Sequence, residues 1–317
     1  MQEHVVYYFS GTGNSLKTAL TIQKALGCCD VVSMCSSHEH HGVEASIGFV
    51  FPCYFGGVPH QVLEFIRNME LPGDLENSGA SELPEASKAP GTSEFPEAPG
   101  TSEIPATSET SVAPEASGTP VASATPHKQA SPYVYAIVTY GAILGSTFGQ
   151  LNEALKSRGI ELNYVAPLKS FANYVVMYEM SSKASEMLVE TKASLQPIIA
   201  DILAQKTTKI KKPLPLLKTY NRLASRNVHT QDRNFVVRES CTSCATCERV
   251  CPAGNIELAE GRPLWLGQCE QCMACLQWCP ERAIDYGEKT QKRDRYTNPE
   301  ITVTMFIDYL HGAGMHS

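Results

Sequence analysis

Most cysteines of the chain lie in two short arrays whose spacing can bind metal. Eight of the twelve cysteines fall in the segments CTSCATCERVCP, from Cys241, and CEQCMACLQWCP, from Cys269. Both segments follow C-x2-C-x2-C-x3-C-P, and each cysteine of the first recurs 28 residues later in the second. This spacing lets three thiolates of one tight loop face three irons of a [4Fe–4S] cube, while the fourth thiolate arrives from elsewhere. The arrays therefore predict two [4Fe–4S] clusters.

Structural zinc is the main alternative for these arrays, because zinc also uses paired C-x2-C units. Zinc takes four ligands, usually as two separated pairs, and needs neither a third cysteine in the same loop nor a trailing Cys-Pro. The spacing therefore favours iron–sulfur clusters over zinc.

The segment that carries the arrays resembles the bacterial-type two-cluster ferredoxins over its whole length, residues 234–290. In those proteins the fourth thiolate of each cluster comes from the other array. The resemblance implies low-potential, one-electron transfer. It assigns one cluster to Cys241, Cys244, Cys247 and Cys279, and the other to Cys269, Cys272, Cys275 and Cys251.

A second candidate site follows the first strand-like run of the chain, where a glycine-containing loop opens a helix-like run. Backbone N–H groups at a helix start bind phosphate, and glycines let the chain approach it closely. Hydroxyl and amide side chains add donors, and the loop contains no Lys or Arg, so neutral groups would hold the phosphate. The loop residues are Ser10, Gly11, Thr12, Gly13, Asn14 and Ser15.

Two other phosphate-binding loops can be compared with this one. A Walker A loop requires G-x4-G-K-[ST], which is absent here. A dinucleotide fingerprint requires a third glycine where Leu16 stands, and no acidic residue closes the second strand, since Asp30 precedes it. The loop instead resembles the phosphate loop of flavodoxins.

Two further segments extend this resemblance and imply an FMN site. Strand-like runs end at Pro52 and at Tyr140, so both endings are expected beside the phosphate loop at the carboxyl edge of a sheet. Aromatic residues there can stack on the flavin ring, although they can also simply pack a loop. The Tyr140 loop lacks the acidic residue of many short flavodoxins. The further candidate residues are Pro52, Tyr54, Phe55, Gly56, Gly57, Tyr140 and Gly141.

Alternating strand and helix signals predict the scaffold for this site. An alternation of this kind argues for a parallel sheet covered by helices on both faces. We expect an α/β, doubly wound, five-stranded parallel flavodoxin-like sheet, followed by a small α+β two-cluster ferredoxin domain. The expected strands are His4–Phe9, Val31–Met34, Ser46–Phe51, Tyr133–Thr139 and Leu162–Leu168, and the expected helices are Asn14–Leu26, Pro59–Met69, Thr147–Ser157 and Ser182–Ala204.

Composition divides the chain further. Residues 1–72 and 132–204 make up the expected flavodoxin-like domain, and residues 73–131 form an acidic insertion rich in Pro, Ser, Thr and Glu that we expect to be disordered. Residues 205–233 are basic and predict a linker, with a partner-docking or membrane-surface role as the alternative. Residues 291–317 form a tail, in which Asn298 and Pro299 are expected to open a helix.

The overall charge says little about partners. The formal net charge is −7, and the acidic insertion accounts for it. No apolar run reaches the roughly 20 residues that span a bilayer, and no signal peptide is recognisable at Met1. We therefore expect a cytoplasmic protein with no transmembrane segment and no nucleic-acid partner.

The order of domains resembles the flavodoxin–ferredoxin fusion proteins of anaerobic bacteria and archaea. The resemblance implies an electron carrier that passes electrons between FMN, two [4Fe–4S] clusters and a redox partner protein. Two alternatives remain open: a flavin-dependent reductase of a small acceptor, and an electron-transfer subunit of a larger redox complex. No general base or nucleophile stands out, so the sequence leaves undecided whether the protein is an enzyme.

Overall fold

The computed structural model describes residues 3–36, 44–69, 131–213 and 215–312. The predicted acidic insertion, residues 73–131, lies outside the described residues except for Ser131. The description below concerns the remaining chain.

A five-stranded parallel sheet forms the first part of the chain. Its order is β2-β1-β3-β4-β5, and every neighbouring pair is parallel. The central strands are rich in Val, Ile, Phe and Tyr and are buried on both faces, as is typical of parallel sheets covered by helices. The expected α/β fold is confirmed. The strands are β1 (Glu3–Tyr8), β2 (Cys29–Ser33), β3 (Glu44–Pro52), β4 (Tyr133–Tyr140) and β5 (Tyr164–Lys169).

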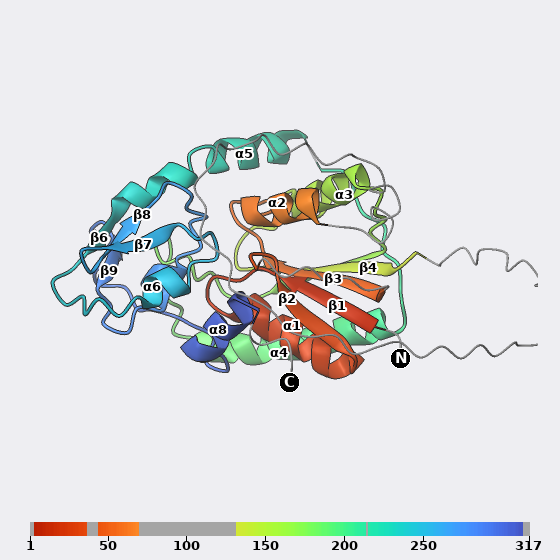
Figure 1. Cartoon of the computed structure of the whole chain (residues 1–317). Helices are drawn as coiled ribbons and strands as arrows, with labels where there is room; N and C mark the ends of the chain where they lie inside the picture. Colours follow the sequence, from red (N-terminus) through yellow and green to blue (C-terminus); the bar gives the residue numbers. More distant parts are fainter. Residues whose placement is uncertain (1–2, 37–43, 70–130, 214, 313–317) are drawn as a thin grey trace, which may run out of the picture. The chain divides into compact units, whose positions relative to one another are not determined.

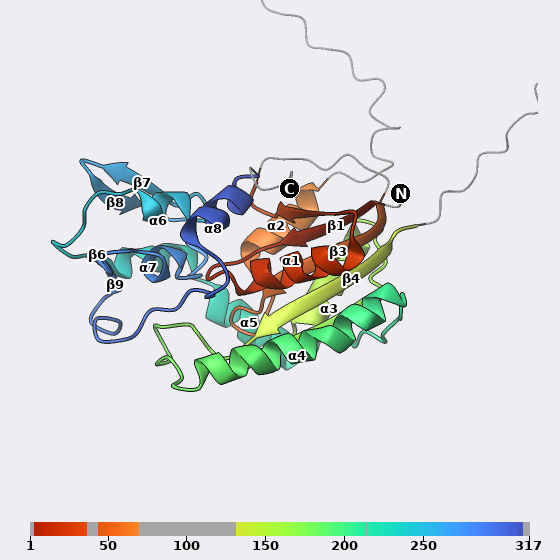
Figure 2. The same ribbon diagram turned by 90° about the horizontal axis from the view of Figure 1, so that it is seen from below.

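Helices cover both faces of this sheet (Figure 1). Apolar residues of α1 and α4 share one core cluster, and those of α2 and α3 share the other. Figure 2 shows α1 and α4 side by side over their face. Each helix presents its apolar stripe to the sheet. The helices are α1 (Asn14–Leu26), α2 (His60–Asn68), α3 (Thr147–Ser157) and α4 (Ala184–Leu203).

The basic segment 205–233 packs on the sheet domain and contains helical structure. The Thr208 N–H donates to the Asn163 carbonyl at 2.9 Å, next to β5. The helix α5 (Pro215–Ser225) follows, and its Asn221 donates to the Phe55 carbonyl at 3.1 Å. The 3-10 helix η1 (His229–Asn234) then leads into the cysteine-rich part.

The cysteine-rich part is a small ferredoxin-like domain built from two short antiparallel pairs and two one-turn helices. Strands β6 and β9 pair, and β7 and β8 form a hairpin. The one-turn helices α6 and α7 each begin one residue before the third cysteine of their array. The elements are β6 (Phe235–Val237), α6 (Thr246–Arg249), β7 (Ile256–Ala259), β8 (Arg262–Trp265), α7 (Ala274–Gln277) and β9 (Ile284–Tyr286).

The backbone repeats the duplication seen in the sequence. Ser243 and Ala245 have left-handed φ angles of 59° in the first array. Gln271 and Met273, at the matching positions of the second, have φ angles of 54° and 61°. Such angles are costly for residues with a side chain, so their recurrence shows that both arrays fold into the same tight loop.

The tail returns to the sheet domain. It contains the expected helix, but the prediction that this helix begins at Asn298 is wrong. The helix α8 spans Val303–Leu310, with Thr302 as its N-cap accepting from the Met305 N–H at 3.1 Å. The expected cap, Asn298, instead forms a turn in which its Oδ1 accepts from the Glu300 N–H at 2.9 Å. The Asn298 N–H donates to the Thr12 carbonyl at 2.8 Å, so docking to the phosphate loop overrides its capping preference.

Buried ion pairs hold the start of this tail against β9. The Asp285 side chain is 2% exposed and accepts from Arg295 Nη2 at 2.7 Å and from Arg238 Nε. Asp285→Ala would leave the 7% exposed Arg295 side chain without its counter-charge. We expect a loss of about 3–5 kcal/mol of stability, or a Tm lower by roughly 10 °C, in thermal unfolding of the cluster-loaded protein.

A matched control for this prediction is Glu153→Ala, which breaks the exposed Lys218–Glu153 pair on α3 and α5. Exposed pairs contribute about 0–1 kcal/mol, so its Tm should stay within a few degrees of the wild type. Equal melting temperatures for both variants would contradict a structural role of Asp285.

Candidate functional site

The cysteines of the first predicted set lie around one small cavity. Two belong to the loop before α6, the third lies within α6, and the fourth follows α7, so the second array contributes to the cavity of the first. Leu258 and Ile284 complete an apolar wall. The structure thus brings together Cys241, Cys244, Cys247 and Cys279.

The second predicted set is more deeply enclosed. Burial raises the pKa of Cys275, and the neighbouring thiols of Cys272 and Cys251 raise it further. Burial likewise raises the pKa of Cys272, with added effects of Cys251 and Cys269. These mutual effects show that the thiols of the second set are neighbours in the fold. Thiols crowded in this way are stabilised when they lose their protons to a metal.

The two sets differ in their contact with solvent. Cys244 is exposed, and hydrogen bonding with Thr246 is the main cause of its lowered pKa. Cys269 and Cys275 of the second set are buried. The first set therefore lies nearer to the protein surface.

Backbone N–H groups donate to the sulfurs at equivalent places of the duplication. The Asn255 N–H donates to Cys251 Sγ at 3.3 Å, and the Ala283 N–H donates to Cys279 Sγ at 3.2 Å. The Gln271 N–H donates to Cys269 Sγ at 3.2 Å. Hydrogen bonds of this type stabilise thiolate charge and help set the reduction potential of a cluster.

The predicted phosphate loop connects β1 to α1, and neighbouring groups orient its polar side chains. Ser10 Oγ accepts from the Gly13 N–H at 3.1 Å, which closes the loop on itself. Thr12 Oγ1 accepts from Asn173 Nδ2 at 2.8 Å. Since each hydroxyl acts as an acceptor in these bonds, its own hydrogen stays available to a ligand.

Two further loop residues are fixed from outside the loop. Asn14 Oδ1 accepts from the Tyr296 hydroxyl at 2.6 Å and from Asn298 Nδ2 at 2.9 Å. Ser15 Oγ lies 3.1 Å from Thr139 Oγ1 at the end of β4. The loop is thus held by both the tail and the sheet before any ligand binds.

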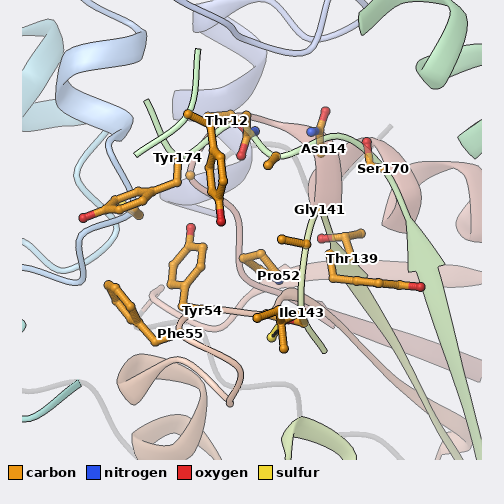
Figure 3. Close-up of a pocket in the computed structure, with 18 of the residues that line it drawn as sticks. Thr12, Asn14, Pro52, Tyr54, Phe55, Thr139, Gly141, Ile143, Ser170 and Tyr174 are labelled. Carbon is orange, nitrogen blue, oxygen red and sulfur yellow. Dashed lines mark hydrogen bonds between the residues drawn. The ribbon is translucent and has the colours of Figure 1, made fainter. Parts of the chain in front are cut away.

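A pocket opens at the carboxyl edge of the sheet, between the phosphate loop and the ends of β3, β4 and β5 (Figure 3). Tyr54 and Tyr174 lie on one side of it, and Thr139 and Gly141 lie on the other. The predicted residues that line this pocket are Ser10, Gly11, Thr12, Asn14, Ser15, Pro52, Tyr54, Phe55, Gly56, Tyr140 and Gly141.

Two predicted residues lie outside the lining. Gly13 has a left-handed φ of 88° at the start of α1, and a Cβ there would lie 3.2 Å from the Cβ of Asn298. Gly57 lies against Asn221, whose amide nitrogen would be 2.3 Å from an added Cβ. Both glycines allow close packing around the pocket rather than forming its wall.

Sequence reasoning missed the wall that follows β5. Ser170, Asn173 and Tyr174 line the pocket, as does Tyr220 from α5. The end of β5 lies at the same carboxyl edge as the ends of β3 and β4, so the topological rule could have identified the residues after it. No comparable signal marks Tyr220, because it reaches the pocket through tertiary packing.

The pocket also reaches the second cysteine array, which sequence reasoning did not anticipate. Gln271 and Cys272 form part of its lining. Gly11 packs so closely on this array that an added Cβ would lie 2.6 Å from the Cys272 carbonyl oxygen. Trp278 Nε1 donates to the Gly11 carbonyl at 2.9 Å. The phosphate loop and the second set of cysteines are therefore in direct contact.

Comparison with known proteins identifies the cysteine-rich part. Residues 239–284 match the family model of the 4Fe-4S dicluster domain, and this match contains all eight array cysteines. No curated protein and no solved structure gave a significant match to the chain. The family match and the clustered cysteines support an iron–sulfur electron-transfer role. Among the described residues, no helix combines the length and the apolar character needed to cross a membrane.

Proposed function

We propose that the protein is an electron carrier that passes electrons between FMN, two [4Fe–4S] clusters and a redox partner protein. The observation that carries this proposal is the pocket at the sheet edge. Its wall contains the phosphate loop on one side and Cys272, from the second cysteine array, on another. A flavin bound there would lie beside a cluster held by the second set.

The pocket offers the neutral hydrogen-bond donors that could hold the phosphate of FMN. Its lining contains no Lys or Arg, so a phosphate would be held by neutral groups. The first N–H groups of α1 have no acceptor within the helix and can bind an anion there. Ser170 Oγ is buried in the lining and has no hydrogen-bond partner among the described residues. Such an atom is available to a polar group of a ligand.

The pocket wall also supplies aromatic surface. Phe55 and Tyr174 contact each other edge to face, with ring centroids 5.9 Å apart. Tyr174 donates from its hydroxyl to Gln271 Oε1 at 3.0 Å, which fixes its ring against the second array. Tyr54 contacts Phe9 edge to face at 6.0 Å. These rings present flat apolar faces that can hold an isoalloxazine ring.

The two cysteine sets fit the clusters. The first set would hold one cluster in the cavity beside Leu258, and the second would hold the other near the flavin pocket. FMN exchanges one or two electrons and each cluster exchanges one. The residues of this chain would position the cofactors, exclude water from them, and supply N–H donors to the sulfurs.

Cofactor analysis of protein purified without oxygen tests the proposal. We expect one FMN and about eight iron and eight sulfide per chain, the total for two four-iron clusters. Iron without flavin, also after incubation with FMN, would refute the flavin part. Zinc in place of iron would overturn the cluster assignment.

Thr12→Val tests the phosphate loop. Valine keeps the shape of threonine but removes the Oγ1 hydroxyl, which is held in place by Asn173. Loss of one hydrogen bond to a charged phosphate costs about 1.5–3 kcal/mol, so we expect FMN to bind roughly ten- to a hundredfold more weakly. Titration of flavin-free protein, followed by quenching of FMN fluorescence, measures this change.

The matched control for Thr12→Val is Thr21→Val on α1. Thr21 Oγ1 donates to the Lys17 carbonyl at 2.8 Å and does not line the flavin pocket. FMN affinity should stay at the wild-type level in this variant. Equal affinities for both variants would show that Thr12 does not contact the phosphate.

A flavin-dependent reductase of a small acceptor is the second candidate function. Ile143 and Met177 line the pocket and are 59% and 63% exposed, so a small molecule can reach it from solvent. Turnover of a quinone or disulfide by the purified protein alone would favour this candidate. Dependence of turnover on an added redox protein would favour the carrier.

A further inference from the structure

Three potential metal ligands meet at a place that neither the flavin pocket nor the cysteine sets use. They are His60 at the start of α2, His229 at the start of η1, and Glu270 between two cysteines of the second array. One ligand atom of each lies within 4.8 Å of those of the others. The three residues come from three segments far apart in the sequence, so only the fold brings them together.

The Glu270 carboxylate is the most informative member of this cluster. Its side chain is 2% exposed, and its Oε2 accepts from the His60 backbone N–H at 3.1 Å. Its Oε1 is buried and has no hydrogen-bond partner among the described residues. The His60 Nδ1 atom is 3.7 Å from this oxygen. A buried carboxylate oxygen without a donor is costly, and a cation would relieve that cost.

His229 points to the same conclusion. Its Nδ1 is buried and likewise lacks a hydrogen-bond partner in the described chain. The rings of His60 and His229 meet edge to face, with centroids 4.8 Å apart. Burial lowers the pKa of His60, and His229 lowers it further, so the neutral imidazole is favoured. Neutral imidazole is the form that binds metal.

We propose that His60, His229 and Glu270 bind one divalent transition-metal ion of the zinc type. Two imidazoles and one carboxylate are a common three-residue ligand set for such ions, with water completing the shell. Ligand atoms of a tetrahedral zinc site lie about 3.4 Å apart, so the three side chains need only small rotations. The His60 side chain is 47% exposed, which gives the ion a path from solvent.

Such an ion would join three parts of the protein. It would tie α2 of the sheet domain to η1 and to the loop of the second cysteine array. Glu64, one turn after His60, has Oε2 3.7 Å from His60 Nδ1 and can orient that ring. The site uses nitrogen and oxygen donors and shares no ligand with the cysteine sets, although Glu270 directly follows Cys269 in the chain. Its expected effect is stabilisation of the contact between these segments.

Zinc binding to the cluster-loaded protein tests the proposal. The protein would be purified without oxygen, treated briefly with a chelator, and dialysed against micromolar Zn²⁺, with zinc and iron measured in the same samples. We expect one zinc per chain in the wild type at unchanged iron content. His60→Ala, His229→Ala and Glu270→Gln should each weaken zinc binding at least tenfold.

A second readout and a control separate this site from other effects. Zinc should raise the Tm of the wild type but not of the His60→Ala or His229→Ala variants. His311→Ala, which changes an exposed histidine after α8, should bind zinc like the wild type. If Glu270→Gln also loses iron, the two histidine variants decide the outcome. Failure of the wild type to bind zinc, or equal binding by the histidine variants, would overturn the proposal.

Discussion

Cys272→Ala is expected to remove the cluster beside the pocket proposed for FMN and to lower the iron content from about eight to about four atoms per chain. Cys272 lies among the buried thiols of the second set, so no solvent ligand can easily replace its sulfur. The first set has its own cavity, formed without Cys272. One cluster should therefore remain.

Iron and sulfide analysis measures this loss, and EPR of the reduced protein identifies the surviving cluster. We expect the signals of two reduced clusters to broaden each other in the wild type, and a single undisturbed cluster signal in the variant. Cys29→Ala is the matched control, because Cys29 is buried in the sheet domain outside both arrays. Wild-type iron in Cys272→Ala would contradict the assignment of this cysteine as a ligand.

Gly11→Ala is expected to damage the pocket proposed for FMN and the second array together. A Cβ on Gly11 would lie 2.6 Å from the Cys272 carbonyl oxygen and 3.1 Å from the Tyr54 hydroxyl. Overpacking of this kind costs about 1–3 kcal/mol, and the clash involves backbone that cannot rotate away. We expect a Tm lower by about 5 °C, flavin binding weakened about tenfold or more, and an altered EPR signal of the second cluster.

Gly159→Ala separates this contact from the general cost of replacing a glycine. Gly159 has a φ of 74°, and an added Cβ there meets no atom within 4 Å. Its replacement strains the backbone by about 1 kcal/mol but should leave flavin content and EPR spectra unchanged. If Gly11→Ala kept both cofactors at wild-type levels, the direct contact between loop and array would be refuted.

Much of the sheet domain could be predicted because local sequence patterns determine it. Helices α1 and α3 begin and end at the expected residues, since each combines a loop start with a regular apolar stripe. The strands shift by only a few residues, as at β5, which begins at Tyr164 rather than Leu162. Continuous apolar runs show that a strand is buried but mark its ends poorly.

The candidate site was predictable only in part. The lining residues that belong to motifs, such as Tyr54 and Gly141, were found from the loops after the strands. Tyr174 and Tyr220 were missed because they carry no motif and reach the pocket through packing. The approach of Cys272 to Gly11 links residues 261 positions apart in the sequence, and no local pattern reports such a contact.

The bonds from Tyr296 and Asn298 to Asn14 have a consequence for biosynthesis. Their partners are separated by 282 and 284 residues. At a synthesis rate of about 5–20 residues per second, Asn14 leaves the ribosome roughly 15–60 s before the groups that fix its side chain. The nascent sheet domain can form its strands during that time, but the phosphate loop gains these supports only after Tyr296 and Asn298 have been synthesised. Loading of a ligand at this loop should therefore follow the synthesis of these residues rather than that of the sheet domain alone.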